Sequence, residues 1–321
     1  MTRRSSASSS LLRAYAMLAL VMVLWAGNAI VGRAIRFDVP PLTFGFGRWL
    51  LATLLLAPWS VGAVRRDWPE VRRHWAVIAG LGLLGIALFN SLLYTGLHHS
   101  TAATATLISA SVPGFVLAFN RVLFGERARP AQLVAVVLAC LGVAVIVFQG
   151  ELARALRLDL GRGELVVLGS SVVWSLYTAL LRLRPPVSPV TFVALTFLVG
   201  TMALAPFAWA EWRAGLVVHW GPGVVAAYGY VAVLASLAAY FLFNAAAMRA
   251  GSAVAGQAIT LLPLFGAVLS ALVLGEQLHL YHLWGMALIL GGIGLGAFAA
   301  GKVRPDSPTG APPAARLEDA P

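Results

Sequence analysis

Ten apolar segments follow one another along this 321-residue chain, separated by short polar breaks. Each is close to the roughly 20 residues that an α-helix needs to cross the hydrocarbon core of a bilayer. The segments are continuously apolar, whereas the strands of a membrane β-barrel would alternate apolar and polar residues. The segments cover residues 14–34, 41–59, 76–97, 101–123, 131–149, 164–181, 189–210, 223–247, 251–275 and 281–300.

The composition excludes a conventional soluble domain. Hydrophobic residues make up 60% of the chain and charged residues 11%, with a mean hydropathy of +0.85. Soluble domains contain about 45–50% apolar and about 25% charged residues, so this chain lacks the polar residues to cover a soluble fold. The single cysteine, Cys140, cannot form an intramolecular disulfide. The sequence therefore predicts an all-α integral membrane protein with ten transmembrane helices.

The distribution of positive charge predicts the orientation of these helices. The net charge is +11, but the Lys and Arg residues stand in the breaks between apolar segments, which favours a topology signal over nucleic-acid binding. With a cytoplasmic N-terminus, the inner breaks and the two terminal segments hold 16 of the 23 Lys and Arg residues, and the outer breaks hold 6. The remaining one is Arg48, inside the second segment. We therefore predict that both termini are cytoplasmic.

The chain contains an internal duplication. Pro113 stands 13 residues before Glu126, and Pro263 stands 13 residues before Glu276, so the two pairs are offset by 150 residues. The runs 41–44 and 189–192, and the pairs Trp25/Arg33 and Trp174/Arg182, match at offsets of 148 and 149. Five segments per copy is an odd number, so the second copy enters the membrane in the opposite orientation. Repeats of inverted topology are typical of secondary transporters.

Several of these features together resemble the drug/metabolite transporter superfamily, specifically proteins with two EamA domains. The matching residues are 24–28, Arg48-Trp49, 109–126, 262–276 and Gly291-Gly292. The resemblance implies a bacterial inner-membrane transporter of ten helices, often an exporter of amino acids or other small metabolites. On this basis we divide the chain into a cytoplasmic segment (1–13), a first five-helix repeat (14–149), a periplasmic linker (150–163), a second five-helix repeat (164–300) and a disordered cytoplasmic tail (301–321).

Arg48 is the strongest candidate for a functional residue. It stands seven residues into its segment, at a depth of about 10 Å, and no acidic residue stands in the middle of any segment. A charge at that depth is costly and needs a cavity or a partner. A substrate carboxylate could bind an arginine bidentately. The alternatives are that Arg48 extends toward the membrane surface or binds carbonyls at a helix end.

Other mid-segment residues could line a substrate path. Pro113 and Pro263 should interrupt their helices at equivalent positions, although each could instead produce a kink for packing. Aromatic and amide side chains suit the wall of a small-molecule pocket, but they also anchor helices at membrane interfaces or to one another. With Arg48, the predicted substrate-binding side chains are Trp25, Asn28, Asn90, Tyr94, Trp174, Tyr177 and Gln257.

A secondary carrier of a small anionic or zwitterionic metabolite is the leading hypothesis. The alternatives are a membrane-embedded enzyme, which would need a catalytic cluster that the segments lack, and a channel or scaffold. We predict no catalytic residues, metal or cofactor, and no nucleic-acid partner. Gly292 and Gly296 form a GxxxG pattern that is compatible with a homodimer.

Overall fold

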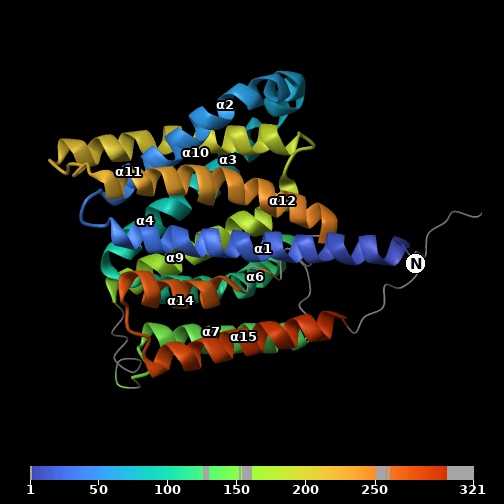
Figure 1. Ribbon diagram of the computed structural model, residues 1–321, viewed down its shortest axis with the longest axis vertical. Coiled ribbons are helices and arrows are strands. Elements are labelled where there is room, and N and C mark those ends of the chain that lie inside the picture. Colours follow the sequence, from blue (N-terminus) through green and yellow to red (C-terminus); the bar gives the residue numbers. More distant parts are fainter. Residues whose placement is uncertain are drawn as a thin grey trace, which may run out of the picture.

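The chain folds into a bundle of α-helices in the computed structural model shown in Figure 1. The structure describes residues 2–125, 130–151, 153, 161–250, 258 and 261–301, and no β-strand occurs among them. The all-α prediction is therefore confirmed for the described part of the chain. Most of the predicted linker 150–163 and nearly all of the predicted tail 301–321 lie outside the described residues.

The helices of the two copies occur in the same order. The first copy contains α1 (Thr2–Ala34), α2 (Pro41–Arg73), α3 (Trp75–Gly82), the π-helical segment η1 (Leu83–Leu88), α4 (Phe89–His99), α5 (Ala102–Ser109), α6 (Val112–Phe124) and α7 (Pro130–Val147). The second contains α9 (Arg162–Leu180), the 3₁₀ turn η2 (Leu181–Leu183), α10 (Pro189–Arg213), α11 (Pro222–Gly229), the π-helical segment η3 (Tyr230–Ala238), α12 (Ala239–Ala250), α14 (Leu262–Leu274) and α15 (Leu280–Gly301).

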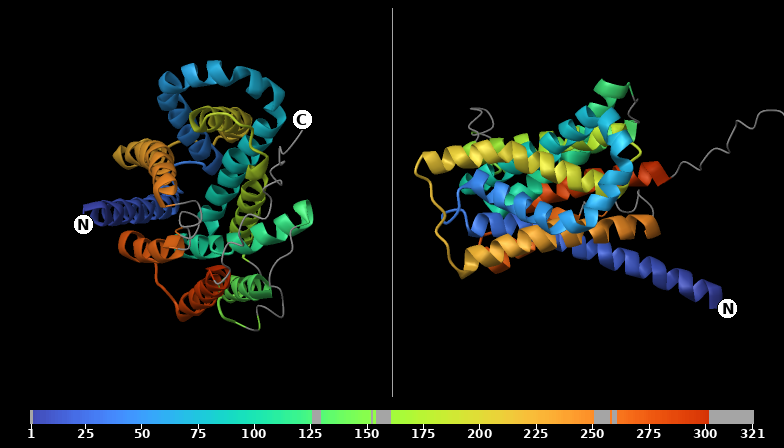
Figure 2. Two further views of the ribbon diagram at one scale, coloured as in Figure 1. Left: turned by 90° about the vertical axis from the view of Figure 1, so that its right-hand side faces the viewer. Right: turned by 90° about the horizontal axis from the view of Figure 1, so that it is seen from above.

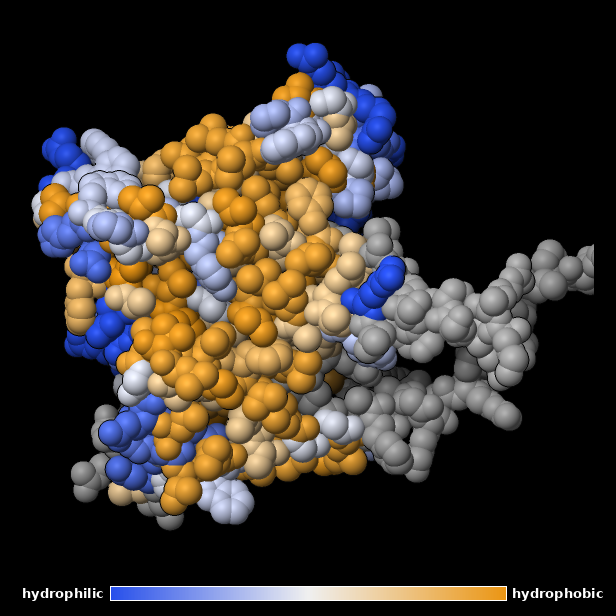
Figure 3. Space-filling view, viewed as in Figure 1, coloured by the Kyte–Doolittle hydropathy of each residue, from blue (hydrophilic) through white to orange (hydrophobic). Residues whose placement is uncertain are grey.

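Length and hydropathy identify a multi-pass membrane protein. Seven described helical segments are long and apolar enough to cross a bilayer, and α14 and the stretch Leu280–Gly292 of α15 are shorter apolar helices. On the face in Figure 3, an apolar belt runs across the middle of the bundle and more polar residues lie toward its ends. The total of ten spans stays a prediction. We call the end that carries the α1–α2 turn the outer end, following the predicted topology.

Two helices extend beyond the predicted segments. Helix α2 continues to Arg73, although the apolar segment ends at residue 59, and it contains Pro58 and Pro69. Helix α1 begins at Thr2, before the predicted start at residue 14. Both extensions are polar, so hydropathy alone assigns them to breaks, whereas polar helix formers such as Arg and Glu continue a helix in water.

The two copies interlock through equivalent helices. Helices α2 and α10 pair along one edge of the bundle, and α7 and α15 pair along the opposite edge (Figures 1 and 2). Helix α1 packs against α12 and α14 of the second copy, and its counterpart α9 packs against α4 and α6 of the first. Each copy therefore completes its packing with helices of the other.

Carboxylates from one copy cap helix N-termini of the other. Glu211, near the end of α10, accepts hydrogen bonds from the backbone N–H of Leu42 (3.1 Å) and Thr43 (2.7 Å) at the start of α2. Asp67, near the end of α2, accepts from the Ser188 backbone N–H (2.8 Å) and the Thr191 hydroxyl (2.7 Å) at the start of α10. A helix N-terminus presents unpaired N–H groups and a partial positive charge, so both contacts stabilise the α2–α10 pair.

Glu276 caps helix α5 in the same way at the outer end. Its carboxylate oxygens accept from the backbone N–H groups of Ala102 and Ala103, both at 3.1 Å, and lie 3.6 Å from Nε of Arg33. Arg33 also donates to the carbonyl of Leu97 (2.7 Å) at the end of α4. These contacts join the outer ends of α1, α4, α5 and the α14–α15 connection.

Candidate functional site

Arg48 lies in the interior of the bundle. Helix α2 begins at Pro41, which suits the first turn because its missing N–H would be unpaired there. Gly47 has no side chain, and a Cβ atom there would lie 2.5 Å from Cε1 of Tyr228, so the glycine allows α2 and α11 to approach closely. Arg48, the next residue, is 4% exposed. The Arg48 side chain therefore lies away from water, where a charge needs partners within the protein.

Four neutral groups surround the Arg48 guanidinium. Its Nη1 donates to Oδ1 of Asn28 (2.9 Å), Oδ1 of Asn90 (3.1 Å) and the hydroxyl oxygen of Tyr94 (2.7 Å). Its Nε donates to the hydroxyl oxygen of Ser236 (2.9 Å). The Tyr94 hydroxyl in turn donates to Oδ1 of Asn28 (2.7 Å). Side chains from α1, α2, α4 and η3 therefore meet in one cluster, which we call the Arg48 cluster.

The Arg48 cluster contains no negative charge. Within the described residues no carboxylate forms an ion pair with Arg48, and Nη2 donates no hydrogen bond to them. A buried charge is costly unless it is paired. The neutral dipoles of the cluster hold the guanidinium in place without neutralising it, so an anionic group would complete the site.

Two π-helical segments position the cluster. η3 begins and ends 147 and 150 residues after η1, so both lie at the same place in their copies. The Ser236 hydroxyl donates to the carbonyl of Val231, five residues earlier in η3, at 2.8 Å. The Asn90 amide donates to the carbonyl of Ile86 in η1 at 2.8 Å. π-helical segments occur often at functional sites, and here each fixes a side chain that holds Arg48.

Aromatic rings adjoin the cluster. Cζ of Arg48 lies 4.4 Å from the ring centroid of Trp49, and Trp49 packs against Phe197 at 4.6 Å. Phe197 contacts Tyr240 edge to face at 5.8 Å, and Tyr240 contacts Trp25 at 6.0 Å. The Trp25 indole donates to the carbonyl of Ala235 (3.2 Å) in η3. Trp25 therefore contacts η3 next to Ser236 but does not contact Arg48 directly, and its role in substrate binding stays a prediction.

Trp174 and Tyr177 form a separate group. Their rings lie 5.0 Å apart, and Trp174 packs against Phe89 at 4.7 Å. Tyr177 belongs to an apolar cluster with Ile78 and Leu81 of α3, and no described hydrogen bond or ring contact joins either residue to Arg48. Their predicted role in substrate binding stays a prediction. Gln257, the remaining predicted binding residue, lies outside the described residues.

The two prolines begin helices at equivalent positions. Helix α5 ends at Ser109, α6 begins at Val112, and Pro113 stands in its first turn. Pro263 stands in the first turn of α14 in the same way. Both helices end at a glycine with a left-handed backbone, Gly125 (φ 69°) and Gly275 (φ 65°). The Pro113 interruption is therefore real, and the role of both prolines in a substrate path stays a prediction.

Ser236 and Trp49 contact Arg48 but are not among the predicted substrate-binding residues. A lone serine in the eighth apolar segment is a detectable signal, because a hydroxyl in lipid needs a partner. Trp49 gives no such signal, since tryptophan is common in membrane helices. Its buried Nε1 has no hydrogen-bond partner among the described residues.

Comparisons with known proteins agree with this architecture. The family model described as "EamA-like transporter family" matches residues 12–148 and 161–297. An "Uncharacterized transporter" of Archaeoglobus fulgidus is 29% identical over 285 residues, covering 88% of this chain and 96% of that protein. The "Aromatic amino acid exporter YddG" of Ancylobacter novellus is 25% identical over 235 residues, covering 70% of this chain and 78% of that protein.

A solved structure shares the fold. Its title is "Crystal structure of protein", and it aligns with a TM-score of 0.57 and 18% identity over 91% of this chain and 98% of its own.

Proposed function

The chain belongs to the EamA-like transporter family, and we propose that it is a secondary carrier that moves a small anionic or zwitterionic metabolite by alternating access. The Arg48 cluster carries this proposal, because it holds a buried cation without a described carboxylate. A substrate carboxylate can accept from Nη2, the guanidinium nitrogen without a described partner. The cluster thus supplies both charge and orientation.

The proposed architecture has ten transmembrane helices in two repeats of inverted topology, with both termini in the cytoplasm of a bacterial cell. Three pairs of equivalent features support the repeats: the π-helical segments, the Pro-initiated helices α6 and α14, and the left-handed glycines that end them. Nearly equivalent halves provide two conformations of similar energy, open to opposite sides, as a carrier requires.

Amino acids are the substrate class we favour, with export as the direction. The relative from Ancylobacter novellus is named an aromatic amino acid exporter. The Arg48 cluster adjoins the rings of Trp49, Phe197 and Tyr240, which offer apolar surface beside a carboxylate site. We favour a carrier over an enzyme because the relatives are named transporters and the cluster holds neutral groups around one cation rather than an acid–base pair.

Counterflow of labelled amino acids in proteoliposomes tests the proposal. The wild-type protein should exchange labelled substrate, and Arg48→Ala should abolish exchange while the protein still inserts and purifies as a monodisperse species. Arg65→Ala is the matched control, since Arg65 is an exposed arginine on the same helix, and it should exchange like the wild type. No exchange by the wild type across a broad metabolite panel would contradict the carrier, and wild-type exchange by Arg48→Ala would place the substrate elsewhere.

A further inference from the structure

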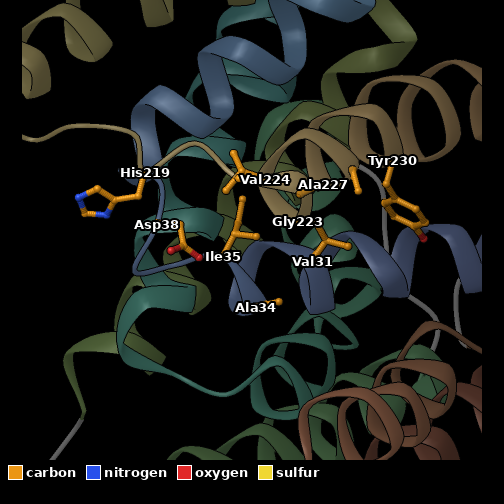
Figure 4. Close-up of a pocket in the computed structure, with 11 residues that line it drawn as sticks. Val31, Ala34, Ile35, Asp38, His219, Gly223, Val224, Ala227 and Tyr230 are labelled. Atoms are coloured by element: carbon orange, nitrogen blue, oxygen red, sulfur yellow. The ribbon is translucent and has the colours of Figure 1, made fainter.

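A pocket of about 590 Å³ lies between α1 and α11, apart from the Arg48 cluster. Val31 and Ala34 of α1, together with Ile35 just after it, form one wall, and Val224 and Ala227 of α11 form the other (Figure 4). Ala226 of α11 also lines the pocket. The walls are aliphatic, and small residues such as Ala34 and Ala226 leave the space between the helices open. Both of these alanines are exposed. The pocket is therefore an apolar groove along the side of the bundle.

The groove runs inward from the outer end of the bundle. The residues Val31, Ala34, Val224 and Ala227 belong to segments apolar enough to cross a bilayer, Arg13–Ala34 and Pro222–Phe243. Tyr230 marks its inner end, and the Tyr230 hydroxyl donates to the carbonyl of Leu24 on α1 (3.0 Å). At 1.5 Å per residue, the seven residues from Gly223 to Tyr230 along α11 span about 10 Å. The groove therefore lies at the depth of lipid acyl chains in one leaflet.

A charged group stands at the outer rim. Asp38 and His219 line the pocket there, and the His219 backbone N–H donates to the Asp38 carbonyl (2.8 Å). Asp38 is exposed and forms no ion pair within the described residues. Figure 4 shows the His219 imidazole pointing away from the groove, so Asp38 is the charged group at this rim. An exposed carboxylate above an aliphatic groove is complementary to a molecule with an ammonium group above a hydrocarbon chain.

We propose that this groove binds a phospholipid with a primary-amine headgroup, such as phosphatidylethanolamine. One acyl chain lies between α1 and α11 and ends at Tyr230. The ammonium group pairs with the Asp38 carboxylate. A free amphipathic substrate could occupy the same groove, and the experiment below distinguishes it from a lipid.

Native mass spectrometry of the purified full-length protein, with added phosphatidylethanolamine or phosphatidylglycerol of identical chains, tests the site. The wild type should retain phosphatidylethanolamine at least about threefold better than phosphatidylglycerol. Ala226→Trp fills the groove and should remove this adduct. Val225→Trp is the matched control, because Val225 is 61% exposed on the same helix but does not line the pocket. Asp38→Asn should still bind lipid but retain both headgroups equally.

Each remaining outcome contradicts the proposal. Equal retention of the two lipids by the wild type would remove the role of Asp38. An unchanged adduct in Ala226→Trp would place the lipid elsewhere, and loss in Val225→Trp would indicate a general effect on lipid contact. Displacement of the lipid by an amphipathic ammonium compound that the protein also transports would show that the groove is part of the substrate path.

Discussion

Glu276 allows a direct test of how the two copies are joined. Helix α5 has three N–H groups at its start that need acceptors, and the side chain of Thr101 accepts from the third, that of Thr104, at 3.0 Å. The Glu276 carboxylate accepts from the other two, those of Ala102 and Ala103. Glu276→Gln keeps one acceptor oxygen but loses the charge, and Glu276→Ala loses both acceptors.

The expected loss follows from the contacts removed. A hydrogen bond to a charged group contributes about 1.5–3 kcal/mol, and an anion at a helix N-terminus about 0.3–1 kcal/mol. The Arg33 contact at 3.6 Å adds little, because such ion pairs contribute about 0–1 kcal/mol. We expect the free energy of unfolding to fall by about 2 kcal/mol in Glu276→Gln and by about 3 kcal/mol in Glu276→Ala. For a chain of this size, these values correspond to decreases in Tm of about 4 and 6 °C.

Thermal unfolding of the detergent-purified protein, followed by tryptophan fluorescence, measures the change. Glu70→Gln is the control, because the Glu70 side chain is 42% exposed and pairs only with His74 on its own helix in the described structure, so its Tm should change by less than about 1 °C. If Glu276→Ala unfolds within about 1 °C of Glu70→Gln, the reasoning about the α5 cap is wrong.

Three further predictions concern buried donors, close helix packing and a second helix cap. Trp49→Phe removes a buried N–H that has no described acceptor, whereas Trp25→Phe removes an N–H that donates to a backbone carbonyl of η3. In thermal unfolding, Trp25→Phe should therefore lower the free energy of unfolding by about 1 kcal/mol more than Trp49→Phe, and equal decreases would contradict this reasoning. Gly142→Val should separate α7 from α15, since a Cβ atom at position 142 would lie 2.6 Å from the Gly285 carbonyl oxygen. We expect this variant to aggregate in size-exclusion chromatography, and a wild-type elution profile would refute the close packing. Glu211→Gln should lower the free energy of unfolding by about 2 kcal/mol because the α2 N-terminus loses a charged acceptor, and an unchanged Tm would show that water replaces it.

The helices could be predicted from sequence because the bilayer imposes a length and a hydropathy on each span. That Arg48 has partners inside the bundle could be predicted for the same reason, since a charge deep in an apolar segment must find partners. Asn28, Asn90 and Tyr94 were predicted as polar residues at mid-span depth, and the structure brings all three onto Arg48. Depth in the membrane is readable from sequence.

The arrangement of the helices beside one another and the hydrogen-bond register within them could not be predicted from the sequence in this way. The π-helical segments have the composition of ordinary apolar helices, so the sequence does not mark their different backbone hydrogen-bond register. Trp174 and Tyr177 occupy the positions equivalent to Trp25 and Asn28 but pack in another cluster. Sequence symmetry predicts equivalent positions, whereas the side chains that differ between the copies decide which of them forms a polar cluster.

The reciprocal caps of α2 and α10 predict what would happen if the gene were split between the two copies. Asp67 of the first copy supplies the acceptor for α10, and Glu211 of the second copy supplies the acceptor for α2. Neither copy provides these carboxylates for itself, so a half-length first copy would leave the N–H groups at the start of α2 without the Glu211 acceptor, and a half-length second copy would keep only the Ser188 side chain as a cap for α10. A split of the gene between the copies should therefore yield two polypeptides that depend on each other for stability, and the fusion into one chain ensures that they are made in equal amounts.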